Sequence, residues 1–428
     1  MPHSSTSIAV TFKSIRGTKD ILPAETARWQ YVESTIRAVF HRFNYKEIRT
    51  PIFEQTSLFA RSIGELTDIV GKEMYTFTDR SDDSITLRPE GTASVIRAYI
   101  QNNLGEAQPL VKVYYIGPMF RQERPQAGRL RQFHQFGAEA IGSPQPEVDA
   151  EIIALTIQIY KELSLTEYSL KINSVGCEKC RPHYREILQA ALRTIAAQLS
   201  PDSQRRIEEN PMRVLDSKDE NDQKLTASMP MITDHLCTEC AGHFESVKKY
   251  LTSFGISFAV DGRLVRGLDY YTKTAFELTS TALGSQDALA GGGRYDLLTH
   301  ELGGKETPGV GFAAGIERLM MALEKKGFAG GIDVRPALFI AAADEVSREW
   351  VISTMMDLRA KGIGVESDHL RRSLKAQMRE ADRQDAAFVI VVGQHEIETG
   401  KAAVKNMKTG EQKEILLKEL ETQFSGLQ

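Results

Sequence analysis

The stretch FRQERPQAGRLRQFHQFGAEA, residues 120–140, decides the fold that we expect for this chain. Together with VKVYYIGPMFR, residues 111–121, it contains two extended runs joined by ERPQAGRL, a loop with proline and glycine. Two such runs on either side of a turn-forming segment predict an antiparallel hairpin with a longer loop. The first large domain is therefore expected to be built on an antiparallel sheet.

One face of this hairpin is expected to form the floor of a pocket. Because side chains alternate between the two faces of a strand, one face should hold Gly117, Arg121, Phe133, Gln135, Gly137 and Glu139. The two glycines would leave room above a guanidinium, an aromatic ring, an amide and a carboxylate. Arginine binds phosphate or carboxylate through two parallel hydrogen bonds, so this face suits an anionic ligand. The alternative is an Arg–Glu pair on a solvated sheet surface.

Four other segments are expected to contribute to the same site. They are LRPEGTA (87–93) with Glu90 and Thr92, RGLDYYTKTAFEL (266–278) with Arg266, Tyr270 and Tyr271, AGGGRYD (290–296), and a helix start with Arg318. Each also has a simpler interpretation. These are an acid at a helix N-terminus, one buried and one exposed tyrosine, a flexible glycine turn, and a solvated arginine. Three glycines in a row otherwise indicate a backbone that a ligand approaches closely.

Length and composition indicate a multidomain protein of the cytoplasm. A chain of 428 residues is expected to form two or three domains. Four cysteines are too few for a disulfide framework, which favours a reducing compartment. The longest apolar run, AAFVIVV (386–392), has the length of a strand, so no membrane partner is expected. A formal charge of -4 argues against non-specific DNA binding, although a local basic patch can still bind RNA.

Changes in residue pattern along the chain predict the domain boundaries. The segment from Cys177 to Tyr250 is helical and polar and contains all four cysteines, which suggests an inserted domain. Near the C-terminus, helices alternate with continuous apolar strands, as in a small α/β domain with a largely parallel sheet. The expected organisation is a first domain over 1–176 and 251–328, a helical insertion over 177–250, a linker over 329–335 and a C-terminal domain over 336–428.

The ordered set of motifs is similar to that of the class II aminoacyl-tRNA synthetases, and within them to the bacterial histidyl-tRNA synthetase family. RTPIFEQ (49–55), the 120–140 stretch and GVGFAAGIERL (309–319) resemble the three class II motifs. RGLDYY and AGGGRYD resemble the two histidine-specific segments, and LRPEGTA and RGTKDILP (16–23) also match. The resemblance implies an α/β protein: an α+β catalytic domain on an antiparallel sheet, a helical insertion and an α/β anticodon-binding domain.

The same resemblance implies the reaction and its participants. ATP would activate L-histidine to histidyl-adenylate, and the histidine would then be transferred to tRNA(His), with release of AMP and pyrophosphate. Mg²⁺ is the expected metal cofactor, and the first motif implies a homodimer. An arginine- and Mg²⁺-rich site suits in-line displacement at a phosphorus atom, because catalysis there is mostly positioning and neutralisation of negative charge.

Individual roles also follow from the resemblance. Arg121 would bind the α-phosphate of ATP, and Arg318 would bind the γ-phosphate and stack on the adenine. Phe133 would contact the other adenine face, Glu123 its edge, and Arg129 the pyrophosphate. The residues expected to line the histidine pocket are Glu90, Thr92, Gln135, Glu139, Arg266, Tyr270 and Tyr271. Catalysis is assigned to Arg121, Arg266 and Arg318, with Arg266 next to the reacting carboxylate and α-phosphate.

Two further features remain open from the sequence. Cys177-x-x-Cys180 and Cys237-x-x-Cys240 have the thiol pairs that tetrahedral zinc prefers, but the family does not require zinc and the gap between the pairs is long. Reduced structural cysteines at helix starts are the alternative. In the C-terminal domain, a basic stripe is expected on one helix, facing RNA or simply solvent, from Arg371, Lys375, Arg379 and Arg383.

Two non-catalytic interpretations compete with a ligase. One is a relative that has lost aminoacylation, such as a regulatory subunit of the first transferase of histidine biosynthesis. The other is an RNA-binding or sensor module built on the same fold. Retention of the motif arginines and of the C-terminal domain argues against both.

Overall fold

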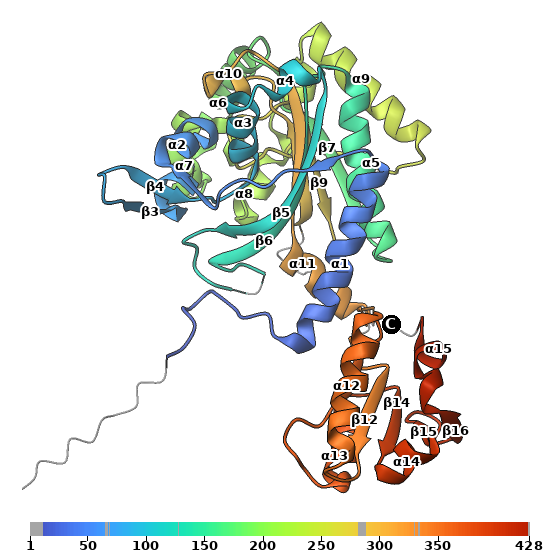
Figure 1. The fold of residues 1–428 in the computed structure, drawn as a ribbon. Helices are drawn as coiled ribbons and strands as arrows, with labels where there is room; N and C mark the ends of the chain where they lie inside the picture. The colour runs from blue at the N-terminus through green and yellow to red at the C-terminus, as the bar shows by residue number, and fades with distance from the viewer. Residues whose placement is uncertain are drawn as a thin grey trace, which may run out of the picture. The chain divides into compact units, whose positions relative to one another are not determined.

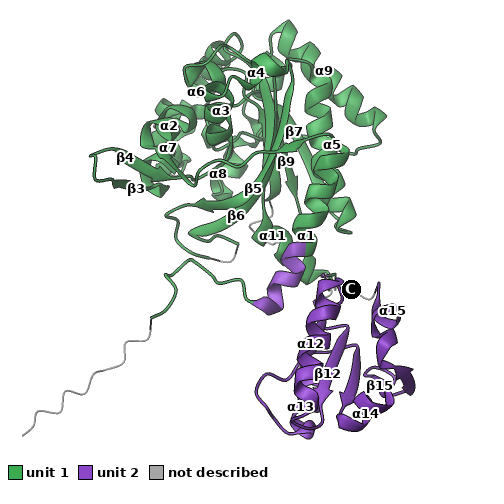
Figure 2. Cartoon of the chain, viewed as in Figure 1, with its two compact units in different colours: residues 1–22, 31–330 green, residues 23–30, 331–428 purple. Residues whose placement is uncertain are grey.

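The fold is described by a computed structural model for residues 12–64, 67, 69–126, 128–280, 288–328, 330–332 and 334–426. The chain divides into two compact units (Figure 2), one of residues 1–22 and 31–330 and one of residues 23–30 and 331–428. Part of the linker expected over 329–335 lies outside the described residues. In the described part of the chain, no helix is long and apolar enough to cross a membrane.

A large sheet forms the centre of the first unit (Figure 1). Its described strands follow the order β1-β5-β6-β11-β10-β9-β7-β8, and neighbours from β5 to β7 are antiparallel. The edge strands β1 and β8 pair in parallel with β5 and β7. The strands are β1 (Lys46–Glu47), β5 (Val111–Phe120), β6 (Gln132–Ile141), β7 (Ser169–Ser174), β8 (Ala259–Val260), β9 (Thr272–Thr279), β10 (Ala288–Arg294) and β11 (Gly309–Gly315). The expected antiparallel sheet is confirmed.

The predicted hairpin is formed by β5 and β6. Gly117 pairs with Gln135, and Val113 pairs with Glu139, so the polar residues of β6 lie on one face as the alternation predicts. The opposite face is apolar and is covered by helices. There Phe40 of α1 (Pro23–Arg42) stacks on Tyr114 with 4.3 Å between ring centroids. Burial of such rings contributes roughly 1.5–3 kcal/mol each, so this layer fixes which face remains open to a ligand.

Helices α5 (Pro146–Glu162) and α9 (Thr238–Ser253) pack against each other, and α5 also packs against β6, β10 and β11. In α5, the apolar residues Ile152, Ile153, Leu155, Ile157 and Ile159 are buried almost completely. A helix with so many buried positions lies between two layers, here the sheet on one side and α9 on the other.

A small antiparallel sheet has the strand order β2-β4-β3, and the LRPEGTA segment begins at the last residue of β4. Its strands are β2 (Phe53–Gln55), β3 (Tyr75–Thr78) and β4 (Ser84–Leu87), and the nearby helices are α2 (Thr56–Ile63), α3 (Thr92–Gln101), α4 (Leu104–Ala107) and α10 (Leu298–Glu301). Glu90 lies between β4 and α3, so it is an acid at a helix N-terminus as expected.

The segment expected as an insertion is helical. It contains α6 (Arg181–Arg193), α7 (Pro201–Glu209), α8 (Glu220–Leu225) and most of α9. Tyr184, Leu188, Leu192 and Ile207 belong to a core cluster of its own. Helix α9, at the end of the segment, packs on α5, β7 and β9, and its Val247 and Leu251 are fully buried. The segment therefore belongs to the same compact unit as the sheet.

The second unit contains a sheet with the order β13-β12-β14-β15-β16 among its described strands. The three strands β13, β12 and β14 are parallel, and β15 and β16 add antiparallel pairs at one side. Its elements are β12 (Leu338–Ala342), α12 (Ser347–Ala360), β13 (Val365–Ser367), α13 (Leu374–Arg383), β14 (Phe388–Val392), α14 (Gln394–Thr399), β15 (Lys401–Asn406), β16 (Gln412–Leu416) and α15 (Leu420–Phe424). The largely parallel core is confirmed, whereas the sequence did not predict α14, β16 and α15.

The basic stripe of this unit is shorter than expected. Arg371 precedes α13 and has a left-handed backbone with φ of 53°, so it does not continue the helix face. Lys375, Arg379 and Arg383 remain on the helix and are exposed, and Arg383 forms an ion pair with Glu380 at 2.5 Å. The basic stripe on α13 therefore consists of Lys375, Arg379 and Arg383, and Arg383 is paired with an acidic side chain.

Candidate functional site

The predicted site residues surround one cavity on the open face of the main sheet. Its volume is about 230 Å³. Among the predicted residues, those that line it are Glu90, Thr92, Arg121, Glu123, Arg129, Phe133, Gln135, Arg266, Tyr270, Tyr271 and Arg318. Glu139 does not line the cavity itself but contacts two residues that do. Segments from five separate parts of the chain thus meet at one place.

The glycines of the floor make room for the cavity's own side chains. A Cβ on Gly137 would lie 2.5 Å from the Tyr115 hydroxyl, and one on Gly117 would lie 2.6 Å from Nη2 of Arg88. A Cβ on Gly311 would overlap the Glu139 carboxylate, and one on Gly291 would overlap the Arg266 guanidinium. The expectation that Gly117 and Gly137 leave open space above the floor is therefore wrong, because side chains occupy it.

The three glycines of AGGGRYD lie within strand β10, which ends at Arg294, and do not form a flexible turn. Gly293 lies against the ring of Tyr271, with 2.9 Å between a built Cβ and Cδ1. The three glycines let long side chains lie flat on the sheet where any larger residue would push them away.

Arginines gather at one end of the cavity. Arg121 lies 5.4 Å above the Phe133 ring, and its Nε donates to the Pro89 carbonyl at 2.9 Å. Arg318, at the start of α11 (Ile316–Lys325), donates to the carbonyls of Gly128 and Ala288 at 3.2 and 3.0 Å. It is therefore held in place and half-buried, and is not the solvated arginine of the simpler interpretation.

The arginines of this cluster outnumber the carboxylate beside them, because Arg129 and Arg121 both pair with Glu123, at 3.2 and 3.8 Å. Burial lowers the pKa of Arg318, and the nearby positive charges of Arg129 and Arg121 lower it further, although Glu123 opposes this effect. Like charges held together in this way favour an anionic ligand, because binding removes the repulsion.

Glu139 is the centre of a buried hydrogen-bonded group. Its carboxylate accepts from Thr92 Oγ1 at 2.7 Å and from the Tyr295 hydroxyl at 2.5 Å, and only 1% of the residue is exposed. Burial raises the pKa of Glu139 from 4.5 to about 8, while the two hydroxyl groups partly counteract the shift. At neutral pH this group is mainly a neutral acid that can donate as well as accept.

Glu90 is both a helix cap and a cavity residue. Its oxygens accept from the backbone N–H groups of Thr92 at 2.7 Å and Ala93 at 2.8 Å, which satisfies the first turn of α3. The carboxylate also lines the cavity, and burial raises its pKa. Both interpretations of LRPEGTA therefore apply at once.

Arg266 lies on the floor of the cavity, with its guanidinium over Gly291 of β10. Its Nη1 donates to Glu277 Oε2 at 2.9 Å, and the guanidinium lies 5.8 Å from the Tyr271 ring centroid. Its Nε has no hydrogen-bond partner among the described residues, and neither does Gln135 Oε1. A buried polar atom without a hydrogen-bond partner has lost its contacts with water and gained none in return. A bound ligand would supply the missing partners of Arg266 Nε and Gln135 Oε1.

Tyr270 and Tyr271 do not point to opposite faces. Tyr270 ends a turn, and Tyr271 directly precedes β9, so the segment is not extended. Their ring centroids lie 4.8 Å apart, and both residues are buried. The interpretation with one core and one exposed tyrosine is therefore wrong.

Sequence reasoning missed several residues of the site. Glu277 and Tyr295 both line the cavity, and Tyr115 fills the space over Gly137. Glu317 accepts from the His134 backbone N–H at 2.9 Å and fixes the start of α11 against β6. Glu277 lies in RGLDYYTKTAFEL and Tyr295 in AGGGRYD, both of which the sequence predicts as parts of the site. The carboxylate of Glu277 and the hydroxyl group of Tyr295 could therefore have identified them as candidates.

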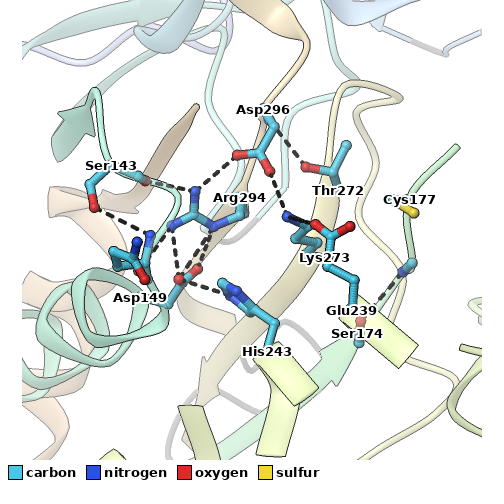
Figure 3. Close-up of polar contacts among 12 residues, drawn as sticks. Ser143, Asp149, Ser174, Cys177, Glu239, His243, Thr272, Lys273, Arg294 and Asp296 are labelled. Atoms are coloured by element: carbon cyan, nitrogen blue, oxygen red, sulfur yellow. Dashed lines mark hydrogen bonds and ion pairs between the residues drawn. The ribbon is translucent and has the colours of Figure 1, made fainter. Parts of the chain in front are cut away.

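A buried ion-pair network anchors the end of β10 (Figure 3). Arg294 donates to Asp149 at 2.9 and 3.1 Å, and both side chains are fully buried. Asp149 also contacts His243 Nε2 at 3.1 Å, and Arg294 contacts Asp296 at 2.9 Å. The network ties β10 to α5 and α9, and thus positions the adjacent Tyr295.

Comparisons with known proteins agree with this geometry. The family model described as histidyl-tRNA synthetase matches residues 17–319, and the model described as anticodon binding domain matches residues 339–427. The histidine–tRNA ligase of Desulforamulus reducens is 51% identical over 405 residues, which are 95% of this chain and 97% of that protein. That of Halothermothrix orenii is 52% identical over 409 residues, with the same two coverages of 95% and 97%.

A solved structure gives the same result. The apo histidyl-tRNA synthetase of Staphylococcus aureus superposes with a TM-score of 0.83 at 43% identity and covers 97% of this chain and 100% of its own. Family models, relatives and structure agree over nearly the whole length. The chain therefore belongs to the histidyl-tRNA synthetase family.

Proposed function

We propose that this chain ligates L-histidine to tRNA(His) in an ATP-dependent reaction through a histidyl-adenylate, as a histidine–tRNA ligase. The single observation that carries the proposal is that Arg121, Arg266 and Arg318, far apart in sequence, line the same cavity. Relatives at about half identity over nearly the full length are histidine–tRNA ligases. The match of residues 339–427 to an anticodon-binding domain supports tRNA as the second substrate.

The arginines suit the first step of the reaction. The histidine carboxylate attacks the α-phosphorus in line, and pyrophosphate leaves, so negative charge spreads over the phosphate oxygens in the transition state. We assign the α-phosphate to Arg121, the γ-phosphate and adenine to Arg318, and the pyrophosphate to Arg129. Phe133, under the Arg121 guanidinium, offers the adenine a second stacking surface, with Glu123 at its edge. Fixed donors contribute most when they need no rearrangement, and the carbonyl contacts of Arg121 and Arg318 hold both in advance.

The other end of the cavity suits the amino acid. An imidazole has two nitrogens that need partners. Glu139 does not line the cavity, so we assign it to this pocket through Thr92 and Tyr295, which do. Thr92 and Tyr295 hold that carboxyl group in place. Glu90, Gln135, Tyr270 and Tyr271 are assigned to the same pocket, and Arg266 to the junction with the α-phosphate.

Mg²⁺ is expected to enter with ATP, since this ion prefers carboxylate and phosphate oxygens together. The carboxylate of Glu277 lines the cavity beside Arg266 and fits that requirement. When bound, the ion supplies charge neutralisation of the phosphates.

The remaining assignments concern assembly and organisation. We propose that the chain forms a homodimer through RTPIFEQ, where Ile52 and Phe53 are 43% and 51% exposed in the single chain. We propose the domain boundaries 1–176 with 251–328, 177–250, 329–335 and 336–428, and a cytoplasmic location, where tRNA is charged. The exposed basic residues of α13 are candidates for RNA contact.

Histidine-dependent ATP–pyrophosphate exchange tests the proposal. We expect exchange in the wild type and a loss of roughly two orders of magnitude in Arg266→Ala, as for removal of one charge-stabilising donor. Arg263→Ala is a matched control in the same segment, because Arg263 is exposed and does not line the cavity. No histidine-dependent exchange in the wild type would favour a regulatory relative, and near wild-type exchange in Arg266→Ala would refute the assigned role.

A further inference from the structure

The four cysteines of the chain meet at one point in the fold. Cys177 and Cys180 precede α6, and Cys237 and Cys240 lie at the start of α9. Their sulfur atoms all lie within 4.8 Å of one another, and none is in a disulfide. The long gap between the two pairs, which left the matter open in the sequence, is thus closed by the fold, which brings the N-terminal ends of α6 and α9 together.

Two of the sulfur separations match a tetrahedral metal site, and all lie within 4.8 Å. The Cys177 sulfur lies 3.7 Å from that of Cys180 and 3.9 Å from that of Cys237. Four thiolates at 2.3 Å from a zinc ion form a tetrahedron with edges of about 3.8 Å. Apolar side chains would pack this part of the core equally well, so packing alone does not explain four neighbouring cysteines. A divalent cation that binds sulfur does require them.

Three nearby features can offset the negative charge of four thiolates once a metal is bound. The Cys237 backbone N–H donates to the Cys180 sulfur at 3.1 Å. Cys180 and Cys237 are the N-caps of α6 and α9, so the positive ends of both helix dipoles face the sulfurs. Arg181, next in sequence, interacts electrostatically with Cys177, Cys180 and Cys240. A tetrathiolate zinc centre has a net charge near -2, which these groups offset.

We propose that Cys177, Cys180, Cys237 and Cys240 bind one structural Zn²⁺ per chain, and that this ion fixes Arg181 as a positioning residue for the amino-acid pocket. Arg181 Nε donates to the Val175 carbonyl at 2.9 Å, and its Nη2 donates to the carbonyl of Tyr271. Tyr271 lines the cavity beside Arg266. A metal that holds the first turn of α6 therefore holds the backbone of the pocket as well.

Metal analysis of the purified full-length protein tests the site without reference to activity. We expect about one zinc ion per chain, released on titration with a mercurial, and exchange with Co²⁺ should give the absorption of a tetrahedral thiolate complex. Cys180→Ser is expected to lose the metal. Glu239→Gln is the matched control. Glu239 lies on α9 between Cys237 and Cys240, but its carboxylate is exposed and is not one of the proposed ligands, so this variant should keep the metal.

The wild-type measurement decides the proposal even if Cys180→Ser does not fold. Zinc-free protein with four titratable thiols that takes up neither Zn²⁺ nor Co²⁺ would overturn it, and so would a disulfide between any two of the cysteines. The positioning role rests on the proposed function. It predicts that stripping the metal raises the histidine KM several-fold with a smaller change for ATP. Equal KM values in loaded and stripped protein would overturn that role, while absence of exchange in both would count against the proposed function instead.

Discussion

Replacement of Glu139 by glutamine is expected to stabilise the first unit at neutral pH but much less at acidic pH. The carboxyl group is buried with Thr92 and Tyr295 as its hydroxyl partners, and burial raises its pKa from 4.5 to about 8. Glutamine has nearly the same shape, and its amide can accept from one hydroxyl and donate to the other. It resembles the protonated acid but cannot ionise.

The sign and size of the effect follow from proton linkage. The folded state holds a proton that the unfolded chain releases above its own pKa, so stability is lost as pH rises from about 4.5 to about 8. Each pKa unit corresponds to about 1.4 kcal/mol, which gives a loss of roughly 3 kcal/mol at about pH 7 and roughly 1 kcal/mol at about pH 5. Because glutamine avoids this loss, its advantage over Glu139 should grow by about 2 kcal/mol between these two pH values.

Calorimetry of wild type and Glu139→Gln at the two pH values measures this difference. Tryptophan fluorescence is unsuitable, because Trp29 and Trp350, the two tryptophans of the chain, both belong to the second unit. Glu106→Gln, at an exposed position of the first unit, is the matched control and should show no comparable pH dependence. An equal shift in Tm at both pH values, or destabilisation by glutamine at neutral pH, would refute the reasoning.

Three other changes test separate parts of the structure. Gly311→Ala places a methyl group on the Glu139 carboxylate and should raise the histidine KM more than the ATP KM in exchange assays; equal effects would contradict the placement. Arg294→Met leaves Asp149 buried without its main partner and should cost about 3–5 kcal/mol, seen as a lower Tm; an unchanged Tm would show that the pair contributes little. Deletion from Val334 onward should spare pyrophosphate exchange and abolish tRNA charging, and intact charging would disprove the role of the second unit.

Local pattern was enough to predict the elements of the site. Alternation along the strand correctly placed Gln135 and Glu139 on one face, because the period of a strand is fixed by backbone geometry. The strand-to-helix transition at Glu90 and the strands of the second unit follow from the same kind of local rule. These features depend on residues close together in sequence.

What the sequence could not predict depends on contacts between distant residues. The hydroxyl group of Tyr115 over Gly137, and the bond from Tyr295 to Glu139, exist only once β5, β6 and β10 share a sheet. Tyr270 and Tyr271 were misplaced because a turn, not a strand, precedes β9. Arg371 was misplaced because the four-residue spacing of basic residues begins at Arg371, before the first residue of α13, Leu374.

The glycines of the floor have a consequence for genetics. Each of them fits the shape of a particular side chain from another part of the chain, as Gly311 fits Glu139 and Gly291 fits Arg266. A substitution at such a glycine should therefore impair the site in the same way as loss of the side chain that it faces, and a genetic screen for lost activity should recover both members of each pair.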